Sequence, residues 1–195
     1  PTPETYRGIV SCTGPRACYD ESKRLGETLC VSFHQQYNIP VRVVRPFNNY
    51  GPGLNIKDRR LLPDLFNNVF RGEDITLLSD GNATRTFCYI TDAISGYIKA
   101  LVNGTSGEAY NIGQDKPEIK IKEIADMVVI AARKELNYNG KIVFETSNDK
   151  YYLTDNPNRR CPDITKSRKE LNFNPSISIE EGIYKSLLWY KENYI

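Results

Sequence analysis

The chain has 195 residues, 39% of them hydrophobic and 26% charged, which is the composition of an ordinary globular protein with one domain or slightly more. Its 26 basic and 24 acidic residues leave a net charge of +2, so neither nucleic acid nor a membrane surface is expected as a partner. No apolar run is long enough to span a bilayer and no signal peptide opens the chain, so we expect a cytoplasmic protein.

The first half of the chain alternates between helix and strand patterns. Residues 19–37 have the period of an amphipathic helix, with Leu25, Leu29 and Phe33 at a spacing of four. The β-branched run 41–44 predicts a strand directly after it.

A turn-rich loop is predicted over 48–53, and a helix over 60–70 that accommodates Pro63 in its first turn. Short strands are predicted over 74–78 and 85–90.

The second half continues the alternation. Asp92 is predicted to cap a helix that runs to about residue 102. The remaining predicted elements are a strand over 109–112, a helix over 121–136, a strand over 141–145, a short helix after Asp163 and a last helix over 179–194. Such an alternation favours an α/β fold with a substantially parallel sheet.

Two side chains at the start of the first helix can carry acid–base chemistry. Tyr19 and Lys23 are four residues apart and so lie on the same helix face, one turn from each other. A cation at that distance favours the phenolate, which can then exchange protons with a hydroxyl group. With 13 tyrosines in the chain, such a pattern is expected by chance alone, so its weight depends on its neighbours.

The cysteines and the first residue carry further information. The five cysteines are scattered, show no C-x-x-C spacing and share the chain with one histidine, His34. No metal site is therefore expected, and free thiols in a reducing compartment are the simpler interpretation. The chain opens at Pro1 in a loop-like stretch without an initiator methionine. We therefore expect a piece of a longer protein.

The neighbouring motifs resemble those of the extended short-chain dehydrogenases/reductases, the NAD-dependent epimerase/dehydratase family. Among its branches the UDP-glucuronate decarboxylases and dTDP-glucose 4,6-dehydratases are the most similar. The motifs that carry the resemblance are, in chain order, GPRACYDESKR at 14–24, RPFNNYGP at 45–52, TRTFCYITD at 84–92, YNIG at 110–113 and RCPD at 160–163.

The resemblance implies a fold and its division. It predicts the C-terminal part of a Rossmann-type parallel sheet with a smaller mixed α/β substrate-binding region. Residues 1–50 are expected to be the remnant of the NAD-binding domain. Residues 51–195 are expected to bind the nucleotide sugar, interleaved with the last elements of the sheet.

The resemblance also implies roles for individual residues. Tyr19 and Lys23 match the catalytic pair, which also contacts NAD, and the cofactor is NAD. The other positions carried over are Phe47, Asn49 and Arg60 for the cofactor, and Asn48, Arg85 and Arg160 for the UDP- or dTDP-sugar. Guanidinium groups suit phosphate oxygens because they donate two parallel hydrogen bonds.

Several family features are missing from this sequence. No G-x-x-G-x-x-G loop follows a strand, and the Thr/Ser-rich catalytic segment of the family is absent. We therefore expect this chain alone to be inactive and the full-length protein to be the enzyme. Decarboxylation and dehydration through a 4-keto sugar, 4-epimerisation, and a non-catalytic nucleotide-sugar-binding role all stay open.

The resemblance also implies an assembly. In the family, the helix of the catalytic tyrosine pairs with its copy around a two-fold axis, so we predict a homodimer through residues 19–37. The alternative is that its apolar stripe packs only on the parent sheet. Cys30 and His34 are expected on the outer flank of this helix, where the two arrangements would differ.

Overall fold

The computed structural model describes residues 1–149, 151, 152, 154 and 156–194. The helices are α1 (Ala17–Tyr37), α2 (Leu61–Arg71), α3 (Ile90–Asn103), α4 (Ile121–Leu136), α5 (Thr165–Leu171) and α6 (Ile179–Asn193). The strands are β1 (Val43–Pro46), β2 (Asn49–Tyr50), β3 (Ile75–Leu77), β4 (Thr84–Arg85), β5 (Cys88–Tyr89), β6 (Ala109–Ile112), β7 (Ile119–Lys120), β8 (Ile142–Phe144) and β9 (Arg159–Arg160).

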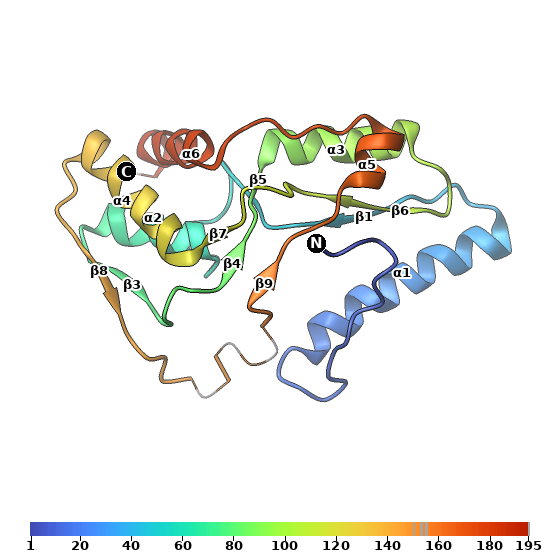
Figure 1. Cartoon of the computed structure of the whole chain (residues 1–195), viewed down its shortest axis with the longest axis horizontal. Helices are drawn as coiled ribbons and strands as arrows, with labels where there is room; N and C mark the ends of the chain where they lie inside the picture. The colour runs from blue at the N-terminus through green and yellow to red at the C-terminus, as the bar shows by residue number, and fades with distance from the viewer. Residues whose placement is uncertain (150, 153, 155, 195) are drawn as a thin grey trace.

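One half of the molecule is built on a parallel strand pair with helices on both sides. β1 and β6 run in parallel, from Val43 opposite Ala109 to Pro46 opposite Ile112. Figure 1 shows α3 and α5 above this pair and α1 below it. Tyr110 and Ile112 of β6 are fully buried against α3 and α5. This is the helix–sheet–helix layering of α/β proteins, so the predicted fold class is confirmed.

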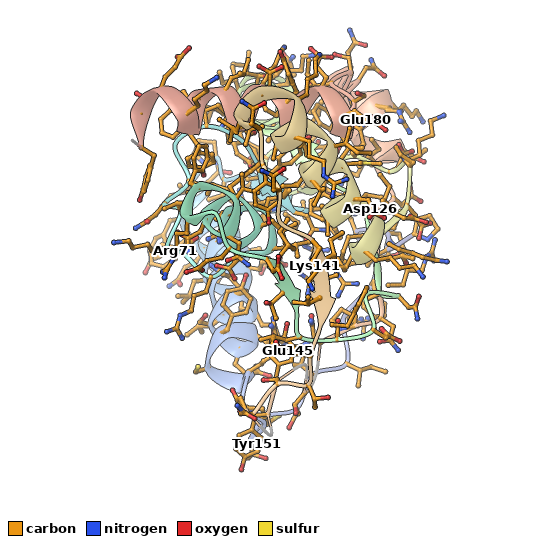
Figure 2. All side chains as sticks on the ribbon, turned by 90° about the vertical axis from the view of Figure 1, so that its left-hand side faces the viewer. Arg71, Asp126, Lys141, Glu145, Tyr151 and Glu180 are labelled. Atoms are coloured by element: carbon orange, nitrogen blue, oxygen red, sulfur yellow. The ribbon has the colours of Figure 1, made fainter. Side chains whose placement is uncertain are left out.

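The other half packs α2, α4 and α6 over a second parallel pair, β3 with β8. Figure 2 shows β8 between the labelled Lys141 and Glu145, below these helices, with the chain continuing toward Tyr151. The core there is apolar and aromatic, with Phe66 and Tyr190 at 5.3 Å between ring centroids. Helix α2 holds Pro63 in its first turn, as its sequence predicted. It ends at Arg71, and Gly72, with φ of 68°, is its C-cap.

Short strands connect the halves. β4 lies between β7, to which it is antiparallel, and β9, to which it is parallel, and β2 pairs in parallel with β5. The single strand predicted over 85–90 is therefore wrong: β4 and β5 belong to different sheets. The amide of Thr86 donates to Arg160, whereas the amide of Cys88 donates to Asn48, so the chain changes partner within three residues.

Two further boundaries differ from the prediction. The strand expected over 41–44 is instead β1, which begins at Val43, because the Val41 amide donates to Ile39 in a turn. Asp92 does not cap α3, which begins at Ile90. Its carboxylate instead accepts hydrogen bonds from the amides of Ser176 and Ile177, at 2.8 and 2.9 Å, in the segment that leads to α6.

Helix α1 buries none of its residues. Its apolar stripe points to solvent, with Leu25, Leu29 and Phe33 exposed to 58, 47 and 46%. Cys30 and His34 were expected on the outer flank, and that is wrong. Cys30 is half-buried, and the His34 ring lies 2.8 Å from the carbonyl of Ile39 and packs on Gly107. None of the described helices has the length and hydrophobicity needed to cross a membrane.

Candidate active site

Tyr19 and Lys23 lie in the first two turns of α1, which starts after a turn closed by the Ala17 amide and the Gly14 carbonyl. Lys23 Nζ lies 5.4 Å from the centroid of the Tyr19 ring, and the guanidinium carbon of Arg16 lies at the same distance. The Tyr19 side chain is 56% exposed. The phenol is thus flanked by two cations and remains open to a ligand.

Two arginines stand side by side on neighbouring parallel strands. Arg85 of β4 is in register with Arg160 of β9, and Arg85 is only 8% exposed. Its guanidinium donates to the carbonyls of Thr84, Pro157 and Asn158, at 2.6 to 3.1 Å. None of the ion pairs found in the described part of the chain involves either arginine.

The charge of Arg160 interacts with side chains at the start of α1. Burial, and next the Arg160 charge, lower the pKa of Arg85. Burial, and next the Arg16 charge, lower the pKa of Arg160, whereas Tyr19 and Asp20 act in the opposite direction. The Arg16 and Arg160 guanidinium groups therefore concentrate positive charge close to the phenol, and Arg85 lies beside Arg160. An anion with several oxygen acceptors, such as a diphosphate, would relieve that repulsion.

Arg16 was not singled out from the sequence. It lies three residues before Tyr19, a spacing that puts both on one helix face, and this was the available signal. Its contact with Asp20 is 3.6 Å long, and its Nε is buried without a hydrogen-bond partner in the structure. A buried donor without a partner is costly, so Arg16 is a candidate to donate to a ligand.

The loop after β1 approaches the same region. The Phe47 amide donates to Ile112, and Phe47 packs on Gly113 at the end of β6. Asn48 has φ of 44°, and its Nδ2 donates to the carbonyl of Thr86 at 2.8 Å. The Thr86 amide in turn donates to the backbone carbonyl of Arg160. Phe47 and Asn48 therefore lie beside the arginine pair, at the carboxyl ends of parallel strands.

Two predicted site residues have other partners. The Asn49 carboxamide is hydrogen-bonded to the Tyr97 hydroxyl of α3, and its Oδ1 is buried without a partner. Arg60 precedes α2, is 64% exposed and pairs with Asp58 at 2.7 Å. Within the described ranges, no contact of Arg60 joins it to Tyr19, Lys23 or the arginines.

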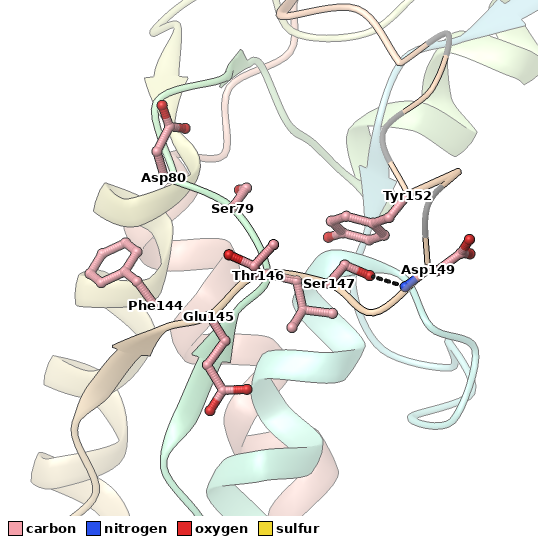
Figure 3. Close-up of a pocket in the computed structure, with 9 residues that line it drawn as sticks. Ser79, Asp80, Phe144, Glu145, Thr146, Ser147, Asp149 and Tyr152 are labelled. Atoms are coloured by element: carbon pink, nitrogen blue, oxygen red, sulfur yellow. Dashed lines mark hydrogen bonds between the residues drawn. The ribbon is translucent and has the colours of Figure 1, made fainter.

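A surface cavity of about 730 Å³ opens at the carboxyl ends of β3 and β8. Figure 3 shows Ser79, Thr146, Ser147 and Tyr152 toward its centre, with the carboxylates of nearby residues directed outward. Burial, followed by the Asp64 carboxylate, raises the pKa of Tyr152, which keeps its hydroxyl a donor. The sequence indicated only a turn at 79–82, and did not indicate this cavity.

The cavity and the arginine pair are linked along the chain. The loop after β3 lines the cavity and continues into β4 with Arg85, and the loop after β8 does the same before β9 with Arg160. Ligands of open α/β sheets bind outside the carboxyl ends of the strands. The two loops therefore connect the cavity to the arginine pair along the chain.

Comparison with known proteins gives the family of this chain. The sequence is 38% identical over 183 residues to UDP-glucuronic acid decarboxylase 5 of Arabidopsis thaliana, covering 94% of this chain and 50% of the relative. It is 33% identical over 192 residues to UDP-glucuronic acid decarboxylase 1 of Xenopus tropicalis, covering 98% of this chain and 43% of the relative. The chain thus spans about half the length of these relatives.

Solved structures show the same fold. A UDP-glucuronic acid 4-epimerase from Bacillus cereus, in complex with UDP-glucuronic acid and NAD, matches with a TM-score of 0.78 at 28% identity, over 97% of this chain and 58% of the other. A dTDP-glucose 4,6-dehydratase from Bacillus anthracis, in complex with NAD, matches with a TM-score of 0.78 at 25% identity, over 97 and 56%. The model of the NAD dependent epimerase/dehydratase family matches residues 3–113, more than half of the chain, and the chain belongs to this family.

Proposed function

We propose that this chain supplies the acid–base pair and the nucleotide-sugar site of an enzyme that acts through a 4-keto sugar. The observation that carries the proposal is that Tyr19 lies between two cations, while Arg160, in register with Arg85, is close enough to Tyr19 for their charges to interact. Tyr19 and the Arg85–Arg160 pair come from segments more than 60 residues apart in the sequence.

The substrate would extend from the cavity after β3 and β8, past the arginines, to Tyr19. Arg160 and Arg16 would hold the diphosphate, because their guanidinium groups have donors available there. The hydroxyl groups of Ser79, Thr146 and Tyr152 suit a pyrimidine, since a hydroxyl can either donate or accept a hydrogen bond. The sugar would then lie between Arg160 and Tyr19.

NAD supplies the hydride acceptor when it is bound. The residues present fit its reactive end: Lys23 and Tyr19 are exposed and adjacent, and Phe47 lies at the same edge of the sheet. We propose these three, with Asn49, as its contacts in this chain. The sequence offers no glycine-rich loop for the pyrophosphate, so that part of the cofactor would need other residues.

Tyr19 would accept the proton of the sugar 4-hydroxyl as C4 is oxidised, while Lys23 stabilises the phenolate. A ketone at C4 acidifies C5 and, when C6 is a carboxylate, allows carbon dioxide to leave. We propose UDP-glucuronate decarboxylation, because the decarboxylases have the higher identity to this chain. The B. cereus epimerase makes 4-epimerisation the second candidate.

The test uses the full-length polypeptide of the gene that encodes this chain, incubated with UDP-glucuronic acid and NAD. Mass spectrometry distinguishes loss of carbon dioxide from a product of unchanged mass, which would indicate epimerisation. Tyr19→Phe is expected to lower kcat by about 10²- to 10⁴-fold with unchanged NAD affinity. Tyr37→Phe, at the exposed far end of the same helix, is the matched control. Full turnover by Tyr19→Phe would refute the assignment.

The 195-residue chain should bind UDP, which calorimetry tests directly, but should not convert UDP-glucuronic acid. Binding by the chain combined with an inactive full-length polypeptide would instead support a non-catalytic module. The five cysteines form no disulfide in the structure, and we propose a reducing, cytoplasmic location on that basis.

A further inference from the structure

The position of α1 depends on polar contacts. The helix buries none of its residues, so it lacks the apolar packing that fixes most helices against a sheet. His34 anchors its C-terminal end, at Ile39 and Gly107. Tyr19 lies four turns away from that anchor, so the placement of the phenol requires a second one.

That second anchor is a two-point ion pair between Glu27 of α1 and Arg45 of β1. Arg45 Nε and Nη2 donate to the two carboxylate oxygens of Glu27, at 2.7 and 2.6 Å. The two side chains are only 28 and 36% exposed, and the Glu27 carboxylate raises the pKa of Arg45. Glu27 lies one turn beyond Lys23 and two beyond Tyr19, on the flank that faces the strands.

The same arginine continues into a network across the sheet. Arg45 Nη1 donates to the Glu4 carbonyl at 2.7 Å, and the Glu4 carboxylate accepts from the amide of Asn111 at 2.9 Å. Asn111 stands beside Arg45 in the β1–β6 register. Its Nδ2 donates to the carbonyl of Asp163 at 3.0 Å, three residues after Arg160.

We propose that Arg45 is a positioning residue, which through Glu27 and Asn111 fixes Tyr19 of α1 relative to Arg160 of β9. The inference rests on the proposed function, since it assigns these two residues to one substrate. Small displacements of a reacting group lower rates strongly, because reaction requires close alignment. Arg45 itself touches neither substrate nor cofactor in this assignment.

The experiment compares Glu27→Gln, Arg45→Gln and the double variant in the full-length polypeptide. Each single change should lower kcat by roughly 10- to 100-fold, with little change in KM for the nucleotide sugar. The double variant should lose no more than either single variant, because both remove the same ion pair.

Asp115→Asn is the matched control. It breaks another two-point ion pair, Asp115 with Arg168 at 2.5 and 2.8 Å, which is of similar exposure and does not involve α1. Asp115→Asn and Glu27→Gln should lower the midpoint of unfolding by similar amounts, but only Glu27→Gln should lower kcat. An equal loss of kcat in both would show that stability, and not position, is the cause.

A second readout does not need activity. Hydrogen exchange followed by mass spectrometry should show faster exchange of α1 amides in Glu27→Gln than in wild type, with β6 unchanged. Unchanged exchange in α1 would overturn the inference, whether or not the enzyme is active. Faster exchange with an unaltered kcat in an active enzyme would also overturn it. The wild type could instead be inactive while α1 amides still exchange faster in Glu27→Gln. That result would contradict the proposed function but support the role of the Glu27–Arg45 ion pair in positioning α1.

Discussion

Replacing Arg160 by glutamine should separate ligand binding from folding, because the two arginines of the site differ in their hydrogen bonds. Arg85 donates to three backbone carbonyls, whereas Arg160 forms no ion pair in the described part of the chain and has its pKa lowered by burial and by Arg16. Arg160→Gln therefore removes a donor from the ligand and relieves repulsion within the folded protein.

The magnitude follows from one charge-assisted hydrogen bond, which contributes about 1.5–3 kcal/mol. For Arg160→Gln that corresponds to a rise in Kd for UDP of roughly 10- to 150-fold. Arg85→Gln should also lower the free energy of unfolding by about 2–3 kcal/mol, because carbonyls of the 157–158 segment lose their donor. Arg160→Gln should leave that free energy unchanged or raise it.

The assay is isothermal titration of UDP into the 195-residue chain at low ionic strength, where electrostatic binding is strongest. Urea unfolding of the same samples gives the stability. The reasoning is refuted if Arg160→Gln unfolds more easily than wild type while its Kd is unaltered, since Arg160 would then serve the fold.

Three further outcomes are expected. Leu29→Glu on the exposed stripe of α1 should lower the sedimentation coefficient of the full-length polypeptide if that face forms a dimer, and a wild type that is monomeric at micromolar concentration would contradict the dimer. Asp92→Ala should lower the free energy of unfolding by about 1.5–3 kcal/mol, because two amides before α6 lose their acceptor; urea unfolding should show almost no change for the exposed Asp126→Ala. Burial raises the pKa of Cys88 to about 12, above the roughly 8.5 of a free thiol. The folded state therefore retains a proton that the unfolded state loses, so stability should fall as the pH rises from 9 to 12. The slope against pH should be smaller for Cys88→Ala, and an identical slope would contradict the account.

Elements with a clear hydrophobic period were predictable. The helices over 121–136 and 179–194 and the strand over 109–112 are found within one residue of their predicted bounds, because burial of one face determines both their period and their length. The strands of two residues, such as β7 and β9, were not predicted. Their existence depends on partners that are distant in the sequence, and two residues contain no measurable period.

The candidate site divides in the same way. The family motifs, the helical spacing of Tyr19 and Lys23, and the positions of Arg85 and Arg160 within those motifs could be read from the sequence, because these are local patterns. Only the tertiary structure placed Arg16 and Arg160 beside Tyr19, opened the cavity after β3 and β8, and turned Asp92 toward the segment before α6. Each of these depends on strand register and on the packing of segments far apart in the chain, and a one-dimensional pattern does not encode distances between such segments.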